Sequence, residues 1–176
     1  ADYDPCLTKY GGGTVDAACI TNIDALNPAL SRNSTVILPT STSNGADKVI
    51  GVGYKDFVFA TRDGDTSEKA KIKAFLKGKT THGLSKSVSE YVGLTPSDSP
   101  FKNLDPAAAA TAIQTGSKDV QSACVWNPFA LQTLRTSKTA GVLWDSSLMP
   151  EEVIDMVVMS TSSLNRDGGD KFACLV

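Results

Sequence analysis

The sequence predicts an α/β fold with a mostly parallel sheet. Short apolar runs of strand length alternate along the chain with segments of helical character, an order typical of βα units. Two helices are expected to begin with the same device, Asp4-Pro5 and Asp105-Pro106, in which Asp caps the helix and Pro enters its first turn. A buried strand ends abruptly at Trp126-Asn127, which places an aromatic ring and an amide at the usual ligand position of an α/β sheet.

The other elements follow from caps, glycine stops and apolar periodicity. Helices are expected over residues 4–10, 23–30, 67–76, from 87 or 89 to 91, from 106 to about 116, and 128–135. Strands are expected over residues 15–20, 34–38, 48–53, 57–60, 80–84, 101–104, 121–126, 142–144 and 153–159. Residues 39–46 form a polar run that predicts a loop, and another element is expected to begin at Ser160.

Composition and charge exclude several classes of protein. At 176 residues the chain is long enough for one domain or two small lobes. The formal net charge of −2, without a basic run, argues against nucleic-acid binding. No apolar run approaches the roughly 20 residues that span a bilayer, and no secretory signal precedes Asp4-Pro5.

The four cysteines do not predict a metal site, because no two of them have the close spacing of a zinc site. Cys19 and Cys124 lie in apolar strand-like runs and are expected to be small buried hydrophobic residues. Cys6 and Cys174 are not placed by the pattern, and the redox state of the cysteines stays open.

Two stretches of the chain echo each other at a fixed offset. Ala18-Cys19-Ile20 matches Ala123-Cys124-Val125, and Asn22 matches Asn127. Each copy predicts a helix, a glycine stop, a strand, a polar pair with Asn and a second helix. Either these are two ordinary αβ units with a generic pattern, or they belong to two similarly built lobes whose strand-end asparagines face one cleft, a favoured kind of ligand site.

An ordered set of segments resembles the type II periplasmic substrate-binding proteins of ABC transporters, in the branch that includes nitrate, sulfonate, taurine and urea binding proteins. No single motif is specific, but the order and spacing match over residues 2–165. The segments are residues 2–5, 15–17, 21–26, 43–47, 76–79, 87–91, 125–129, 145–147 and 150–156.

The resemblance implies one nearly complete lobe and part of a second. The expected boundaries are 1–47 for the partial lobe one, 48–159 for lobe two with crossing strands at both ends, and 160–176 for the segment that returns toward lobe one. The family's leader, first strand and closing helices are not found in this sequence, and we expect a fragment or a shortened form. The family also implies an extracytoplasmic location and an ABC permease as partner.

The resemblance further implies that residues of both lobes bind a small polar or anionic solute. The expected ligand-binding residues are Thr21, Asn22, Ser43, Asn44, Ser87, Val88, Ser89, Trp126, Asn127 and Asp145. The helix start near Ser87 would offer free backbone N–H groups to an anion. Structural roles compete with this interpretation: Ser87 or Ser89 as a helix cap, Trp126 as core, and Asn127 and Asp145 as caps. Closure is expected to bend two crossing segments, Ser43–Gly53 and Val153–Thr161.

An enzyme is not expected. His82 is the only histidine and alternates within a strand-like run, which favours a structural role. The sequence contains no phosphate loop, dinucleotide fingerprint or metal-ligand cluster, so we expect no cofactor and no bound metal. The alternative function is a stand-alone module of the same fold without a transport role, which would complete its missing lobe by pairing with a second copy.

Overall fold

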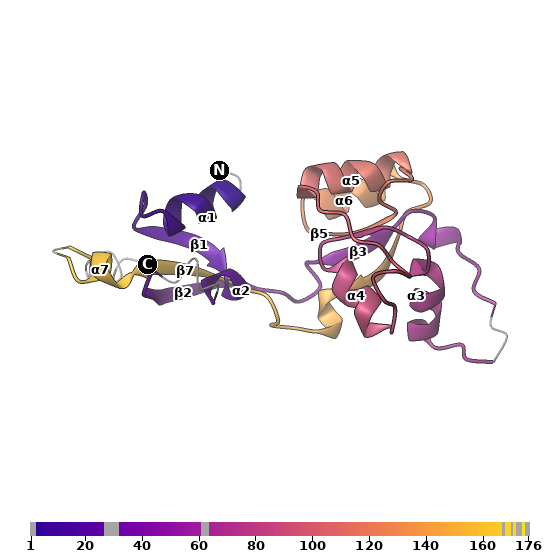
Figure 1. The fold of residues 1–176 in the computed structure, drawn as a ribbon, viewed down its shortest axis with the longest axis horizontal. Coiled ribbons are helices and arrows are strands. Elements are labelled where there is room, and N and C mark those ends of the chain that lie inside the picture. The colour runs from indigo at the N-terminus through magenta and orange to yellow at the C-terminus, as the bar shows by residue number, and fades with distance from the viewer. Residues whose placement is uncertain are drawn as a thin grey trace. The chain divides into compact units, whose positions relative to one another are not determined.

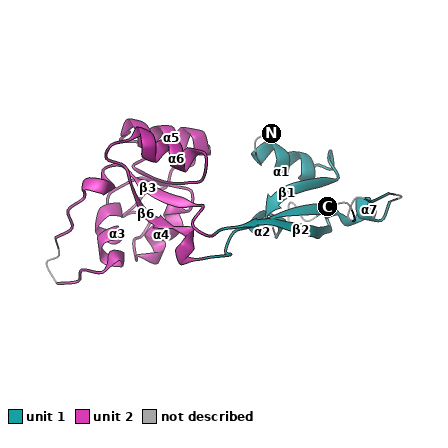
Figure 2. Ribbon diagram, turned by 180° about the vertical axis from the view of Figure 1, so that it is seen from behind, with its two compact units in different colours: residues 1–43, 150–176 teal, residues 44–149 magenta. Residues whose placement is uncertain are grey.

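A computed structural model of the chain describes residues 3–26, 32–60, 64–166, 168, 169, 171 and 174. The chain divides into two compact units (Figures 1 and 2). Unit 1 comprises residues 1–43 and 150–176, and unit 2 comprises residues 44–149. Residues 150–159 are expected from the sequence in the second lobe, whereas the strand in this segment pairs with two strands of unit 1.

Unit 1 is built on a three-stranded antiparallel sheet in the order β1-β7-β2. Its strands are β1 (Ala17–Thr21), β2 (Ser34–Thr42) and β7 (Ile154–Ser160). The helices are α1 (Tyr3–Gly11) and the short α2 (Asn22–Ala25) and α7 (Thr161–Leu164). Helix α1 lies over β1 and encloses a small core of Tyr10, Ala18, Ile20 and Val158 (Figure 1).

Three expectations for unit 1 need correction. Strand β2 does not end at Leu38 but continues through Pro39 to Thr42, because β7 supplies a partner and an edge strand tolerates a proline. Cys19 is exposed, because the side-chain alternation of β1 buries its neighbours Ala18 and Ile20 instead. Helix α2 ends at Ala25, and residues 27–30 of the expected helix lie outside the described residues.

Unit 2 has a four-stranded sheet in the order β4-β5-β3-β6. Its strands are β3 (Lys48–Gly51), β4 (Thr81–His82), β5 (Ser122–Val125) and β6 (Gly141–Asp145). Its helices are α3 (Glu68–Leu76), α4 (Ser85–Tyr91), α5 (Pro106–Thr115) and α6 (Phe129–Thr136), with the 3-10 turns η1 (Tyr54–Asp56) and η2 (Ser146–Leu148).

The expectation of a mostly parallel sheet is corrected to a mixed sheet. Strands β4 and β5 are parallel, whereas β3 is antiparallel to both of its neighbours, β5 and β6. Helical crossovers keep β4, β5 and β6 in one direction, as βα units require. Strand β3 enters the sheet directly from unit 1 without such a crossover, and it therefore can run against the others.

Helices cover both faces of the unit 2 sheet (Figure 1). Along β3, Val49 faces a core with α3 and α4, and Ile50 faces a second core with α5 and α6. Gly51 is required beside them, because a Cβ atom there would lie 2.4 Å from the ring of Phe75. The result is a sheet between two layers of helices.

Local signals set several boundaries in unit 2 correctly. Asp105 caps α5 by accepting a hydrogen bond from the N–H of Ala108, and Gly116 ends the helix in the left-handed conformation. Ser67 caps α3 in the same way. Two expected strands are wrong: residues 57–60 have no regular structure, and Phe101 makes only an isolated bridge to Thr81.

Candidate functional site

The carboxyl ends of β5 and β6 lie at one edge of the unit 2 sheet. Both strands run antiparallel to β3, whose first residue Lys48 is in register with Val125 and with Asp145. Trp126 and Asn127 follow β5 directly, and helix α4 begins three residues after β4. The structure therefore brings Trp126, Asn127 and Asp145 to the same sheet edge, where ligands bind in many α/β proteins.

Trp126 and Asn127 present unused binding groups at this edge. The Trp126 side chain is 44% exposed, so it is not a core residue. Asn127 is also exposed, and its amide makes no hydrogen bond to any described residue. The N-cap residue of α6 is Pro128, and no side chain caps this helix. The alternative role expected for Asn127, as the cap of α6, is therefore wrong. An indole face and an amide with two donors and an acceptor oxygen remain available to a ligand.

Asp145 is held within its own turn. Its carboxylate accepts hydrogen bonds from the N–H of Ser147 at 2.9 Å and from the Ser147 hydroxyl. The Lys48 ammonium lies 3.8 Å from the other carboxylate oxygen and donates to the Gly45 carbonyl at 2.9 Å. The hydrogen bonds from Ser147, followed by the charge of Lys48, hold the pKa of Asp145 below its usual range. The capping role predicted as the alternative is therefore present.

Helix α4 does not use its serines as expected. The helix begins at Ser85 after Leu84, which has no capping side chain, and neither Ser87 nor Ser89 caps it. Ser87 is exposed on the surface of α4, whereas Val88 is buried in the core. The Ser89 hydroxyl is also buried and donates to the Ser99 hydroxyl at 3.1 Å. Of these three residues, only Ser87 presents its side chain to solvent.

In unit 1 the strand-end residues are already engaged. The Thr21 hydroxyl donates to Asp24, accepts from the Asp24 N–H and so caps α2. Asn22 donates to the Glu152 carbonyl at 3.1 Å and accepts from the Ile154 N–H at 3.0 Å. Tyr3 joins this group: its hydroxyl donates to Asp24, and burial together with Asp24 raises the pKa of Tyr3 to about 12. Sequence reasoning missed Tyr3, because only the fold brings α1 to the end of β1.

Ser43 and Asn44 are neighbours with different surroundings. Ser43 is buried in unit 1, and its hydroxyl accepts from the Val153 N–H at 3.1 Å. Asn44 begins unit 2 and is exposed. The next residue, Gly45, donates its N–H to the Ser146 hydroxyl at 2.9 Å, which ties this turn to the end of β6. Asn44 thus belongs with the unit 2 edge, and Ser43 does not.

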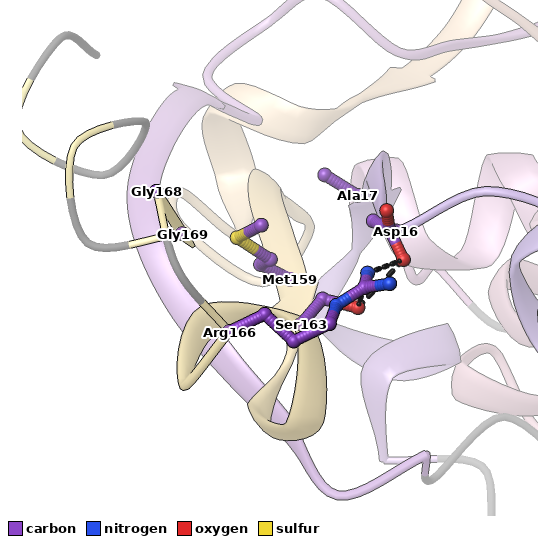
Figure 3. Close-up of a pocket in the computed structure, with 7 residues that line it drawn as sticks. All are labelled: Asp16, Ala17, Met159, Ser163, Arg166, Gly168 and Gly169. Carbon is purple, nitrogen blue, oxygen red and sulfur yellow. Dashed lines mark hydrogen bonds and ion pairs between the residues drawn. The ribbon is translucent and has the colours of Figure 1, made fainter.

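A separate hollow of about 410 Å³ lies in unit 1 (Figure 3). Its polar lining is a network in which the Arg166 guanidinium and the Ser163 hydroxyl both donate to the Asp16 carboxylate. The hydrogen bond from Ser163 is the main cause that lowers the pKa of Asp16. None of the predicted site residues lines this hollow, and its polar groups are satisfied by one another. Asp16 lies about 150 positions from Ser163 and Arg166 in the chain, so no sequence signal could have predicted this network.

His82 has the position of a structural residue. Its Nδ1 atom accepts from the Leu104 N–H at 3.2 Å, lies 3.2 Å from the Lys102 carbonyl oxygen, and the residue is 6% exposed. Cys124 is buried as expected, and burial raises the pKa of its thiol to about 12. Among the described residues there is no group of three potential metal ligands, and no helix combines the length and apolarity that a membrane crossing needs.

Comparison with known proteins identifies the fold. Neither a protein-family model nor a curated protein matches the sequence. Among solved structures, the periplasmic aliphatic sulphonate binding protein SsuA from Escherichia coli is similar over 96% of this chain and 52% of its own, with 17% identity and a TM-score of 0.67. The alkanesulfonate-binding protein SsuA from Xanthomonas axonopodis pv. citri, bound to MOPS, is similar over 96% and 55%, with 19% identity and a TM-score of 0.66.

A third solved structure extends the similarity to a different bacterium. The ligand binding component of an ABC-type import system from Staphylococcus aureus is similar over 98% of this chain and 57% of its own, with 11% identity and a TM-score of 0.68. The chain spans about half the length of these three proteins. It therefore has the fold of the periplasmic substrate-binding proteins of ABC transporters, as the sequence predicted.

Proposed function

We propose that the chain binds a small polar or anionic solute outside the cytoplasm, as the substrate-binding component of an ABC transporter that delivers the solute to a permease. The observation that carries the proposal is the edge of the unit 2 sheet. It exposes the Trp126 indole and an Asn127 amide that bonds to no described residue, at a ligand-binding position of α/β proteins. The similar solved structures are two sulfonate-binding proteins and the ligand binding component of an ABC-type import system, and they support a binding role.

The predicted residues differ in whether their side chains are available to contact a solute. From unit 2 we assign Trp126, Asn127, Asn44 and Ser87, whose side chains are exposed. In unit 1 the Thr21 hydroxyl bonds Asp24 and caps α2, so a ligand contact by Thr21 would cost it these hydrogen bonds. Asn22, Ser43 and Ser89 use their side chains within their own units, so a direct ligand contact would require them to give up existing hydrogen bonds. Val88 is assigned to the core.

Charge at the unit 2 edge favours recognition by hydrogen bonds. Lys48 and Asp145 neutralise each other at 3.8 Å, and Asp145 is further satisfied by Ser147. An anionic solute would therefore be held by neutral donors such as the Asn127 amide more than by an excess positive charge. Salt weakens attraction between exposed charges but has little effect on hydrogen bonds from neutral donors. We therefore expect the affinity for the solute to depend only weakly on ionic strength.

A thermal-shift screen with calorimetric confirmation tests the proposal. The panel contains alkanesulfonates including MOPS, nitrate, urea and short amides. A solute at 100 times its dissociation constant stabilises the folded state by about 2.7 kcal/mol, which raises the Tm of a chain of this size by about 5–10 °C. The double variant Trp126→Ala/Asn127→Ala is expected to lose the shift, and the exposed aromatic Tyr91, changed to Ala, serves as the matched control.

The outcomes separate cleanly. A shift that is lost in the double variant and kept in Tyr91→Ala supports the assignment. No stabilisation by any member of the panel would contradict solute binding. A shift that survives in the double variant would remove the unit 2 edge from the site. No feature of the described residues favours the alternative of a stand-alone dimeric module.

A further inference from the structure

Two side chains of unit 1 hold the segment that returns from unit 2. Asn22 bonds to the Glu152 carbonyl and to the Ile154 N–H, at 3.1 and 3.0 Å. The Ser43 hydroxyl accepts from the Val153 N–H at 3.1 Å. The Ser43 backbone donates to the Val153 carbonyl at 2.7 Å and accepts from the Glu151 N–H at 2.8 Å. We call this set, Asn22 and Ser43 with residues 151–154, the unit 1 clasp.

A smaller set of hydrogen bonds lies on the other side of the crossings. The buried Ser146 hydroxyl accepts from the N–H groups of Gly45 and Asp47, at 2.9 and 3.2 Å. The Ser146 N–H donates to the Asp47 carbonyl at 3.0 Å, and the Met149 N–H donates to the Ser146 carbonyl at 3.2 Å. Residues 45–47 and 146–148 are therefore fixed to unit 2.

Very little backbone remains between the two sets. On the first crossing only Asn44 is left, and it makes no hydrogen bond to any described residue. On the second crossing Met149 and Pro150 are left. The next residue, Glu151, has a positive φ of 66°, a conformation that residues other than Gly, Asn and Asp rarely adopt. Such backbone persists only where its surroundings hold it in place, and here the bond to Ser43 does so.

We infer that Asn22 and Ser43 are positioning residues that lock residues 151–154 to unit 1 and so confine bending between the units to Asn44, Met149 and Pro150. This joint is much shorter than the segments Ser43–Gly53 and Val153–Thr161 expected from the sequence, because β3 and β7 are rigid parts of two sheets. Only the role of this bending, which would close the protein on a solute, rests on the proposed function; the location of the joint does not.

Limited proteolysis without solute tests the inference. A glutamate-specific protease cuts after Glu151 and Glu152, inside the clasp, and chymotrypsin cuts after Leu148, which is 69% exposed next to the joint. In the native chain we expect fast cleavage at Leu148 and slow cleavage at Glu151 and Glu152. In Ser43→Ala, cleavage at the two glutamates is expected to be about tenfold faster, the usual consequence of losing one such hydrogen bond, and in Asn22→Ala, which loses two, at least as fast. Cleavage at Leu148 should be unchanged.

Two further measurements keep the test decisive. Ser41→Ala removes a hydrogen bond from β2 to Asp155, two residues before Ser43 and outside the clasp, and it is expected to leave cleavage at Glu151 and Glu152 unchanged. Chymotryptic cleavage after the fully buried Tyr10 reports general unfolding of unit 1. Glutamate cleavage that rises alone supports the clasp. An equal rise at Tyr10, or no rise at Glu151 and Glu152, overturns it. Because no solute is added, this result is independent of the solute screen.

Discussion

Asn22 in unit 1 and Asn127 in unit 2 occupy matching places in two similar stretches of chain. Each follows a strand that is preceded by a helix, in α1-β1-α2 and in α5-β5-α6. The Asn22 side-chain amide donates one hydrogen bond to the backbone of residue 152 and accepts one from the backbone of residue 154. The Asn127 amide makes no hydrogen bond within the described residues. The two positions therefore share a local pattern and differ in use, because the returning segment covers one strand end and leaves the other open.

The cores of the two units differ as well. Among the described residues, unit 1 has a core cluster of four buried hydrophobic residues under one main helix, whereas unit 2 has larger cores on both faces of its sheet. A small core depends more on each member and on hydrogen bonds at its margin. This difference explains why the unit 1 strand end is used for structure, and it sets the order of the effects expected from mutation.

The largest expected effect is on the small core. Ile20→Ala is expected to destabilise unit 1 by about 2–5 kcal/mol, the usual cost of truncating a buried Ile, and to leave the amide exchange of unit 2 unchanged. The matched variant Ile50→Ala, equally buried in unit 2, is expected to do the reverse. Hydrogen exchange resolved by residue provides the measurement. Equal loss of protection in both units after either change would show that the units unfold together.

The second effect concerns the strand-end amide of unit 1. Asn22→Ala removes two hydrogen bonds to the backbone and is expected to lower the free energy of local opening at residues 152–154 by about 1–3 kcal/mol, while global unfolding of unit 1 changes little. Exchange of the Ile154 amide measures the local effect, and exchange of the amide of the buried Tyr10 reports global unfolding. Asn22→Asp keeps the acceptor for Ile154 but loses the donor to the Glu152 carbonyl, so it is expected to keep only part of the protection. Unchanged exchange at Ile154 in Asn22→Ala would break the contrast between the two asparagines.

A smaller effect depends on pH at the unit 2 edge. The pKa of Asp145 is lower in the folded chain than its unfolded value of about 4. The ionised carboxylate therefore favours folding above that value, and this contribution is lost as the pH falls through the folded-state pKa. Asp145→Asn should cost less than about 1 kcal/mol at pH 6, because solvent screens the group, and still less at pH 3. Thermal unfolding at the two pH values measures this, and a cost that grows toward pH 3 would contradict the assignment.

The smallest effect on stability is expected at Asn127 and Trp126. Asn127→Ala and Trp126→Ala should each change stability by no more than about 0.5 kcal/mol, since both side chains are exposed. Loss of the solute-induced thermal shift is expected for the same variants. Denaturant unfolding and the solute screen are run in parallel. A marked destabilisation by Asn127→Ala would assign it a structural role like that of Asn22.

Local sequence signals predicted much of this fold. The Asp105 cap and the Gly116 stop bound α5, Ser67 begins α3, and the apolar run before Trp126 forms β5. These features depend on residues close together in the chain, whose conformational preferences are nearly independent of the rest of the fold. The ordered set of such segments was also enough to indicate the fold of the periplasmic substrate-binding proteins.

The tertiary structure decided what each strand-end residue does. Trp126 and Asn127 were expected at a strand end and lie there, exposed, but the same pattern at Thr21 and Asn22 did not reveal the engagement of these residues with Asp24 and residues 152–154. The direction of β3 and the exposure of Cys19 also depended on which strands became neighbours. The sequence by itself determined most of the elements, the α/β class and the positions of the polar strand ends. Only the tertiary structure decided which of those ends stay open, because their partners lie up to about 130 residues away in the chain.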